Sequence, residues 1–135
     1  MVGIGSDHTD RKVEAYGVTV SKQMCPKPIG RDLWFFSEVQ DHWDSLILRS
    51  FVHRDGKRML YQEGSVTRML APEELISRFA EGSPVLPIGT VMYCGTMPLL
   101  QPMGPADLFE MELEDPVLGR KLRHRYKVRT LPYSD

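Results

Sequence analysis

One Asp-Gly pair near the middle of the chain constrains the fold more than any other feature. Asp55-Gly56 separates two segments of strand-like composition, residues 45–54 and 57–64. An Asp-Gly pair accepts the two positive φ angles of a type I′ turn, whose twist matches that of two antiparallel strands. The sequence therefore predicts a β-hairpin, and with it a fold built on antiparallel β-structure.

The rest of the chain alternates between short helical patterns and further strands. Residues 6–16 predict a short helix or helical turn that Gly17 ends, and residues 32–44 predict a helix whose aromatic side faces the core. Pro72 and Gly82 delimit a third short helix. Strands are predicted at 18–20, at 90–94, and as a pair at 108–114 and 121–131. The fold class is therefore α+β, mainly antiparallel, with short helices across the sheet.

Composition limits the domain count and the partners. The 135 residues fit one domain, residues 1–135, and Lys+Arg 17 against Asp+Glu 18 leave a net charge of -1. This balance provides no field for a polyanion, so we expect no nucleic-acid partner. No apolar run is long enough to span a bilayer, so no membrane partner is expected. Cys25 and Cys94 form no Cys-x-x-Cys motif, which favours a reducing, cytoplasmic location.

Acidic residues near the N-terminus form a candidate cation site. Asp7, Arg11 and Glu14 are spaced at i, i+4 and i+7, so in a helix they share one face with Asp10 beside them. Converging carboxylates suit a hard cation such as Mg²⁺ or Mn²⁺. The alternative is a solvated helix face on which Asp7 and Arg11 form an ordinary surface ion pair.

Lys22 is a candidate active-site cation. It lies between the predicted strand 18–20 and a proline-constrained loop, a position from which a side chain can point into a pocket. The alternative is a plain surface lysine, as for Lys12 and Lys27 nearby. His8 adjoins Asp7 and is a titratable neighbour of such a site.

Three glutamates on the strand 108–114 offer a second possible ligand set. Glu110, Glu112 and Glu114 alternate with apolar residues and so share one strand face. The basic segment 120–127 is predicted to lie opposite them. Cross-strand ion pairs therefore explain both segments without a metal, and we favour that interpretation.

Several segments resemble, in order, motifs of the fumarylacetoacetate hydrolase-like superfamily. Residues 6–14 with 21–26 resemble its "Asn-Asp-x-Ser-x-Arg-Asp-x-Gln … Lys-Ser-Phe … Pro" stretch. Residues 89–96 resemble its strand ending in Gly-Thr, and 107–114 its "Gly-Asp-x-Val-x-Val-x-Val" strand. An uncharacterised branch, a domain of unknown function, shares "Gly-Ser-Asp-His-Thr-Asp-Arg" and "Ser-Lys-Gln-Met-Cys-Pro-Lys-Pro". The resemblance implies the C-terminal part of that superfamily's β-roll.

The same resemblance implies roles for individual residues. Asp7 would bind Mg²⁺ or Mn²⁺, Arg11 would face the substrate's oxygens, and Lys22 would stabilise an enolate. Thr96 would hold a substrate carboxylate, and further substrate contacts would come from Glu14 and Gln23. Glu14 stands where the superfamily has glutamine.

The superfamily also draws a Glu-x-Glu pair and a Glu–His pair from strands upstream of the matching segment. We therefore expect the chain to be the C-terminal portion of a catalytic domain of about 220 residues. Missing strands would expose sheet edges, which favours a homodimer.

The sequence is consistent with two functions. The first is a divalent-metal-dependent enzyme that hydrolyses, decarboxylates or isomerises a small 2-oxo or 1,3-dicarbonyl acid through an enolate. The second is a non-catalytic carboxylate-binding or scaffold module.

Overall fold

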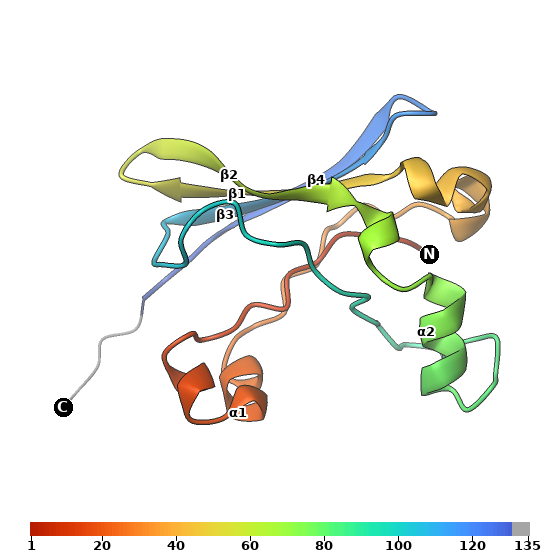
Figure 1. Ribbon diagram of the computed structural model, residues 1–135, viewed down its shortest axis with the longest axis horizontal. Coiled ribbons are helices and arrows are strands. Elements are labelled where there is room, and N and C mark those ends of the chain that lie inside the picture. Colours follow the sequence, from red (N-terminus) through yellow and green to blue (C-terminus); the bar gives the residue numbers. More distant parts are fainter. Residues whose placement is uncertain (131–135) are drawn as a thin grey trace.

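A computed structural model describes residues 1–130, which form an α+β fold around one four-stranded sheet (Figure 1). The spatial order of the strands is β2-β1-β3-β4, and each neighbouring pair is antiparallel. The predicted fold class is therefore confirmed. The predicted last strand ran to Leu131, which lies outside the described residues. The strands are β1 (Ile47–Arg54), β2 (Lys57–Ser65), β3 (Leu108–Asp115) and β4 (Arg120–Lys127).

The Asp-Gly hairpin is confirmed as the joint between β1 and β2. Asp55 has φ 51° and Gly56 has φ 73°, which are the two left-handed positions of a type I′ turn. Farther along, Ser50 pairs with Gln62 and Phe51 with Leu60, so one extra residue bulges from β2. The second strand pair, β3 and β4, is confirmed as well.

One face of the sheet carries the core. Leu46 and Val39 have no exposed surface, and Trp34 is 7% exposed. The first residues of the chain lie against this face and run antiparallel to residues 28–34, since Val2 bridges to Trp34 and Gly5 to Ile29. The other members of the core are Ile4, Val66, Met111, Leu113 and Leu122.

Two arms extend from the core side of the sheet (Figure 1). The α1 arm carries α1 (Val18–Gln23), and the α2 arm carries α2 (Pro72–Phe79). The helix predicted between Pro72 and Gly82 is thus confirmed, with proline in its first turn and Gly82 at φ 93° just beyond its end. No helix in residues 1–130 combines the length and the apolar character that crossing a bilayer requires.

The prediction of a helix over residues 6–16 is only partly right. The helical part is a single 3-10 turn, Val13–Ala15. The Asp10 carboxylate accepts the backbone N–H groups of Lys12 and Val13, so the turn begins only after Asp10. Residues 6–10 are not helical, and the shared helical face that we expected for the acidic residues does not form.

Two predicted strands are wrong. Residues 18–20 form the first turn of α1, where the Ser21 hydroxyl donates to the Val18 carbonyl oxygen at 2.7 Å. Residues 90–94 form no strand, because Gly89 and Gly95 bend the backbone at φ 86° and 143° on either side. Strand propensity fails at both places because no neighbouring strand supplies hydrogen bonds.

The aromatic segment 32–44 is not one α-helix but two 3-10 helices, Phe36–Glu38 and Gln40–Ser45, with non-helical angles at His42. Its aromatic side still faces the core. Trp34, Phe36 and Trp43 pack there, whereas Phe35 is 62% exposed.

Candidate functional site

An ion pair joins two of the residues that the sequence analysis singled out. The Lys22 ammonium donates a hydrogen bond to Oδ2 of Asp7, and the Lys27 ammonium lies 3.3 Å from Oδ1. The hydrogen bond from Lys22 is the largest influence on the Asp7 carboxyl, and with Lys27 it lowers the pKa of Asp7 despite the opposing effect of burial. Asp7 is therefore a carboxylate at neutral pH, held by two ammonium groups.

Backbone hydrogen bonds bring the two halves of this pair together. The Ser6 N–H donates to the Pro28 carbonyl oxygen at 2.9 Å, and the Asp10 N–H donates to the Ser21 carbonyl oxygen at 3.1 Å. Residues 6–10 are thereby fixed beside α1 and the loop that follows it. Lys22 lies in the last turn of α1, not after a strand as predicted.

Lys27 holds the N-terminal segment, residues 6–10, against α1, and we call this set of contacts the Lys27 clamp. Its ammonium donates to the His8 carbonyl oxygen at 2.5 Å and to the Lys22 carbonyl oxygen, in addition to its contact with Asp7. An ammonium has three N–H donors, and all three are engaged. In contrast, Asp7 is the hydrogen-bond partner of Lys22 in residues 1–130, which leaves Lys22 with two donors for a ligand.

A half-buried polar network adjoins this ion pair. The Tyr126 hydroxyl donates to Ser6 Oγ at 2.9 Å, and the same oxygen lies 2.9 Å from Nδ1 of His8. The phenol hydrogen is used on Ser6, so His8 must donate through Nδ1, which leaves Nε2 as its acceptor. Burial lowers the pKa of His8, with Lys27 and Arg11 adding to the effect. Burial raises the pKa of Tyr126 to about 12.

Tyr93 packs on the same region. A Cβ atom on Gly5 would lie only 2.7 Å from Cε1 of Tyr93, so the ring rests directly on the Gly5 backbone. Burial raises the pKa of Tyr93, and the Asp7 carboxylate raises it further. No local sequence pattern connects Tyr93 or Tyr126 with Asp7, so neither was predicted as a site residue.

The other predicted site residues form no hydrogen bond or ion pair, within residues 1–130, with the lysine pair, which is Lys22 and Lys27 on the Asp7 carboxylate. Arg11 pairs with Glu14 at 2.7 Å on the 3-10 turn, and Gln23 is exposed at the end of α1. Thr96 accepts a hydrogen bond from Gln62 at 2.9 Å beside the edge of β2. Within residues 1–130 no hydrogen bond or ion pair connects these four residues to Asp7 or Lys22, so their substrate roles stay predictions.

The donor set does not fit a divalent metal. Hard cations take several oxygen ligands, often from one or two carboxylates. Asp7 is a single carboxylate, and lysines hold both of its oxygens. In the part of the chain that the structure describes, no three His, Cys, Asp or Glu side chains converge on a common point.

The glutamates of β3 form the expected cross-strand ion pairs. Glu112 contacts Lys121 at 3.0 Å and Arg123 at 2.8 Å on β4, and Arg49 at 3.1 Å on β1. Glu110 and Glu114 have basic partners as well. The interpretation of this strand as an ion-paired face is confirmed.

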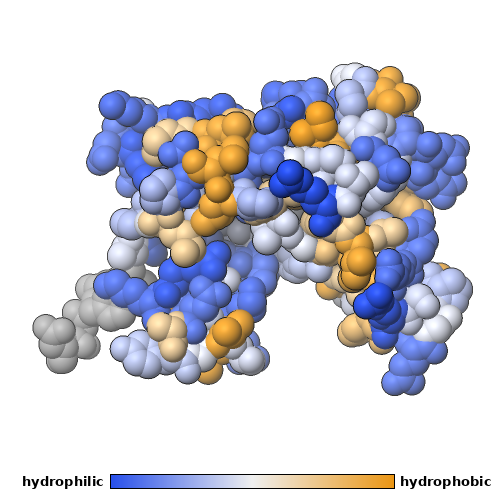
Figure 2. All heavy atoms as spheres, in the orientation of Figure 1, coloured by the Kyte–Doolittle hydropathy of each residue, from blue (hydrophilic) through white to orange (hydrophobic). Residues whose placement is uncertain are grey.

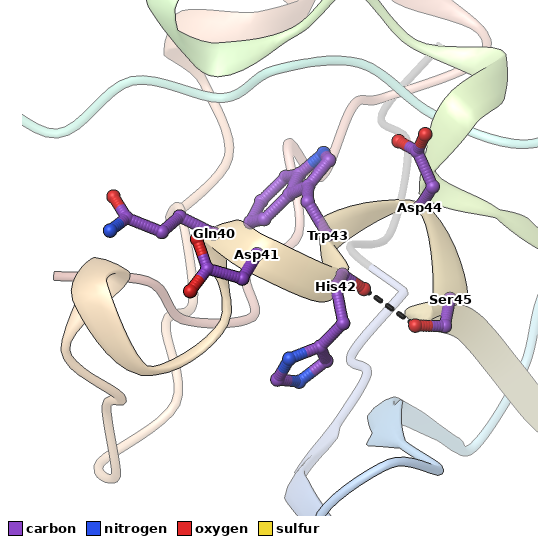
Figure 3. Close-up of a pocket in the computed structure, with 6 residues that line it drawn as sticks. All are labelled: Gln40, Asp41, His42, Trp43, Asp44 and Ser45. Carbon is purple, nitrogen blue, oxygen red and sulfur yellow. Dashed lines mark hydrogen bonds between the residues drawn. The ribbon is translucent and has the colours of Figure 1, made fainter.

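Two surface pockets of the described residues are lined by other residues than Lys22 and Lys27. One, of about 450 Å³, is lined by residues 40–45 (Figure 3). There the Ser45 hydroxyl donates to the His42 carbonyl oxygen at 2.6 Å, and the His42 ring is bonded to buried Asp115 at 3.0 Å. These polar groups hold the turn together. Another hollow, of about 490 Å³, lies around Arg54 and Asp107.

Comparison with known proteins identifies the family. No curated protein and no solved structure matches the chain. The profile of the family described as "Protein of unknown function (DUF2848)" matches residues 1–126, which includes every residue of the lysine pair and its network. The chain therefore belongs to the DUF2848 family.

Proposed function

We propose that the chain is a fumarylacetoacetate hydrolase-like enzyme, whose Lys22 stabilises the enolate of a small 2-oxo or 1,3-dicarbonyl acid. The observation that supports this proposal is the contact between Lys22 and Asp7, which lie 15 residues apart. These are two of the positions to which the resemblance assigns active-site roles.

The chemistry follows from the free donors of Lys22. Breaking a bond next to a carbonyl leaves an electron pair that moves onto the carbonyl oxygen as an enolate. A fixed ammonium beside that oxygen lowers the barrier by stabilising the developing charge. Asp7 keeps the ammonium oriented, and no step requires a metal. Hydrolysis, decarboxylation and isomerisation all share this enolate.

The charge of the cluster favours binding of an organic anion. Lys22 and Lys27 contribute two positive charges against the single negative charge of Asp7. The excess positive charge attracts a carboxylate, whether or not it reacts. A non-catalytic carboxylate-binding module is therefore the second candidate.

Oxalate, an enolate mimic, tests both candidates. We expect isothermal titration to show oxalate binding to the wild-type chain. Lys22→Ala should weaken binding at least tenfold, because it removes both free donors. Lys57→Ala, at the exposed lysine that begins β2, is the matched control and should bind as wild type. Equal binding by wild type and Lys22→Ala would refute the site.

Turnover separates the two candidates. Oxaloacetate is a 2-oxo acid that loses carbon dioxide through an enolate. Wild-type protein that accelerates this loss, with Lys22→Ala at the buffer rate, supports the enzyme. Oxalate binding without any acceleration supports the binding module instead.

A further inference from the structure

In residues 1–130, the Tyr93 hydroxyl has no hydrogen-bond partner, although it lies near the Asp7 carboxylate. The Tyr93 ring crosses the Gly5 backbone, so a Cβ atom on Gly5 would lie 2.7 Å from Cε1 and 3.1 Å from the hydroxyl oxygen. Gly5 comes two residues before Asp7 in the sequence. A phenol both donates and accepts hydrogen bonds, so one donor beside the ion pair is unused.

The second tyrosine of this region differs, because its hydroxyl hydrogen is already used. The Tyr126 hydroxyl donates to Ser6 Oγ at 2.9 Å, and its oxygen lies 2.9 Å from Nδ1 of His8. Tyr93 is 38% exposed, and the Lys22 side chain is 40% exposed. A ligand from solvent can therefore reach both the Tyr93 hydroxyl and the Lys22 ammonium.

The loop that carries Tyr93 is anchored on the sheet just after that residue. Gln62 of β2 donates to Thr96 Oγ1 at 2.9 Å and to the Met97 carbonyl oxygen at 2.5 Å. Met97 itself is buried, at 2% exposed. Gly95 has φ 143°, a backbone conformation that other residues rarely adopt. These contacts fix the backbone that presents Tyr93, as a binding residue requires.

The space between the two arms leaves room for a ligand. Residues 89–97 cross from the α2 arm to the sheet (Figure 1), and Figure 2 shows that the surface is hollowed between the two arms. The α1 arm carries Lys22 in the last turn of its helix. This arm is therefore open to solvent on the side that faces the α2 arm.

We propose that the Tyr93 hydroxyl donates a hydrogen bond to the organic anion that Lys22 binds, and that Gly5 is the positioning residue that admits the Tyr93 ring. This role rests on the proposed function, because it extends the same site. A 2-oxo acid offers one oxygen to each donor. Lys22 takes the carbonyl oxygen, where the enolate charge develops, and Tyr93 takes a carboxylate oxygen. The phenol thereby orients the acid without adding charge.

Tyr93→Phe separates this role from simple packing, because it keeps the ring and removes only the hydroxyl. That hydroxyl bonds to nothing in the described residues, so the variant should unfold at the same urea concentration as wild type. Isothermal titration should show oxalate binding about tenfold more weakly, as expected when a hydrogen bond to a charged group is lost. Tyr16→Phe, at a tyrosine that is 93% exposed, is the matched control and should bind oxalate as wild type.

Gly5→Ala tests the positioning role of Gly5. The added methyl group would lie 2.7 Å from the Tyr93 ring and displace it, so oxalate binding should weaken as in Tyr93→Phe. In the Tyr93→Phe background the same change should cost no further affinity, because the hydroxyl is already absent. Tyrosine ultraviolet absorption supplies a readout that destabilisation alone would not move. Oxalate should shift this absorption in wild type and in Tyr16→Phe, but not in Tyr93→Phe.

The possible results distinguish this role from the proposed function itself. Oxalate binding that is lost in Lys22→Ala but unchanged in Tyr93→Phe would overturn the role of Tyr93 and leave that of Lys22 intact. Wild-type protein that binds no oxalate would overturn both. Losses of affinity from Gly5→Ala and Tyr93→Phe that add together in the double variant would overturn the positioning role of Gly5.

Discussion

At the residue scale, Lys27 connects the N-terminal segment to α1. It holds the Asp7 carboxylate and two backbone carbonyl oxygens, one from each segment. Pro26 and Pro28 flank it and restrict the backbone that presents it. The sequence contained these prolines but gave no indication of which oxygens Lys27 would meet, because its partners depend on how the loop folds back.

Lys27→Ala tests this clamp. The change leaves two carbonyl oxygens and part of a carboxylate without their donor. We expect a loss of about 1–2 kcal/mol of unfolding free energy and weaker oxalate binding. Urea denaturation measures the first and titration the second. The Lys57→Ala control should lose neither, and a Lys27→Ala protein as stable as wild type would show that the clamp is not needed.

Among the buried acids of the described residues, Asp115 has the most hydrogen-bond partners. It has no exposed surface and bonds to His42, to Arg120 and to the backbone N–H groups of Val117 and Leu118. It thereby joins the β3–β4 turn to the 3-10 helix at 40–45. This is a structural role.

Asp115→Ala should destabilise the fold by about 3 kcal/mol, because it leaves buried donors unpaired. Thermal or urea unfolding measures the loss. Asp107→Ala, at an exposed acid before β3, is the control and should cost little. Unfolding of Asp115→Ala at the wild-type midpoint would contradict this interpretation.

At the scale of elements, the successful predictions were those based on residues that mark a turn or the end of a helix. The Asp-Gly turn and the Pro-to-Gly helix carry their own signals, and both are confirmed. Residues 18–20 and 90–94 had only strand propensity, and neither found a partner strand. The helical spacing of residues 6–16 was overridden by the side chain of Asp10, which captures the backbone locally.

Gly56→Val tests the hairpin turn. A β-branched residue at φ 73° is strained, so we expect a loss of about 1–2 kcal/mol in unfolding free energy. A Cβ atom there meets nothing within 4 Å, so the loss would report backbone strain alone. Urea denaturation that gives equal stability for Gly56→Val and wild type would exclude the left-handed turn.

The ion-paired face predicts a pH dependence of stability. Burial acts to raise the pKa of Glu112, but hydrogen bonds from Arg123, Lys121 and Arg49 outweigh it and lower that pKa below the ordinary 4.5. A lowered pKa stabilises the fold above pH 4.5, and this stabilisation disappears as the pH falls through the folded-state pKa. Glu112→Gln cannot titrate. Its unfolding free energy should therefore fall less between neutral and acid pH than that of wild type, and parallel curves would contradict the network.

At the scale of the whole molecule, the fold brings distant residues to one site. The sequence predicted Asp7 and Lys22 as site residues because both lie in matching motifs near the N-terminus. It could not predict Tyr126, whose hydroxyl reaches His8 across 118 residues, or Tyr93 on the Gly5 backbone. Such contacts depend on the sheet and the arms together. Arg11 and Thr96 also lie in matching motifs, but their hydrogen bonds go to Glu14 and Gln62.

Proton exchange tests directly whether Lys22 stabilises an enolate. Pyruvate in deuterium oxide exchanges its methyl protons through its enolate, and proton NMR follows the loss of the methyl signal. We predict that the wild-type chain accelerates this exchange above the buffer rate and that Lys57→Ala does the same, whereas Lys22→Ala does not. Exchange at the buffer rate with wild-type protein, or equal acceleration by Lys22→Ala, would contradict the enolate-stabilising role of Lys22.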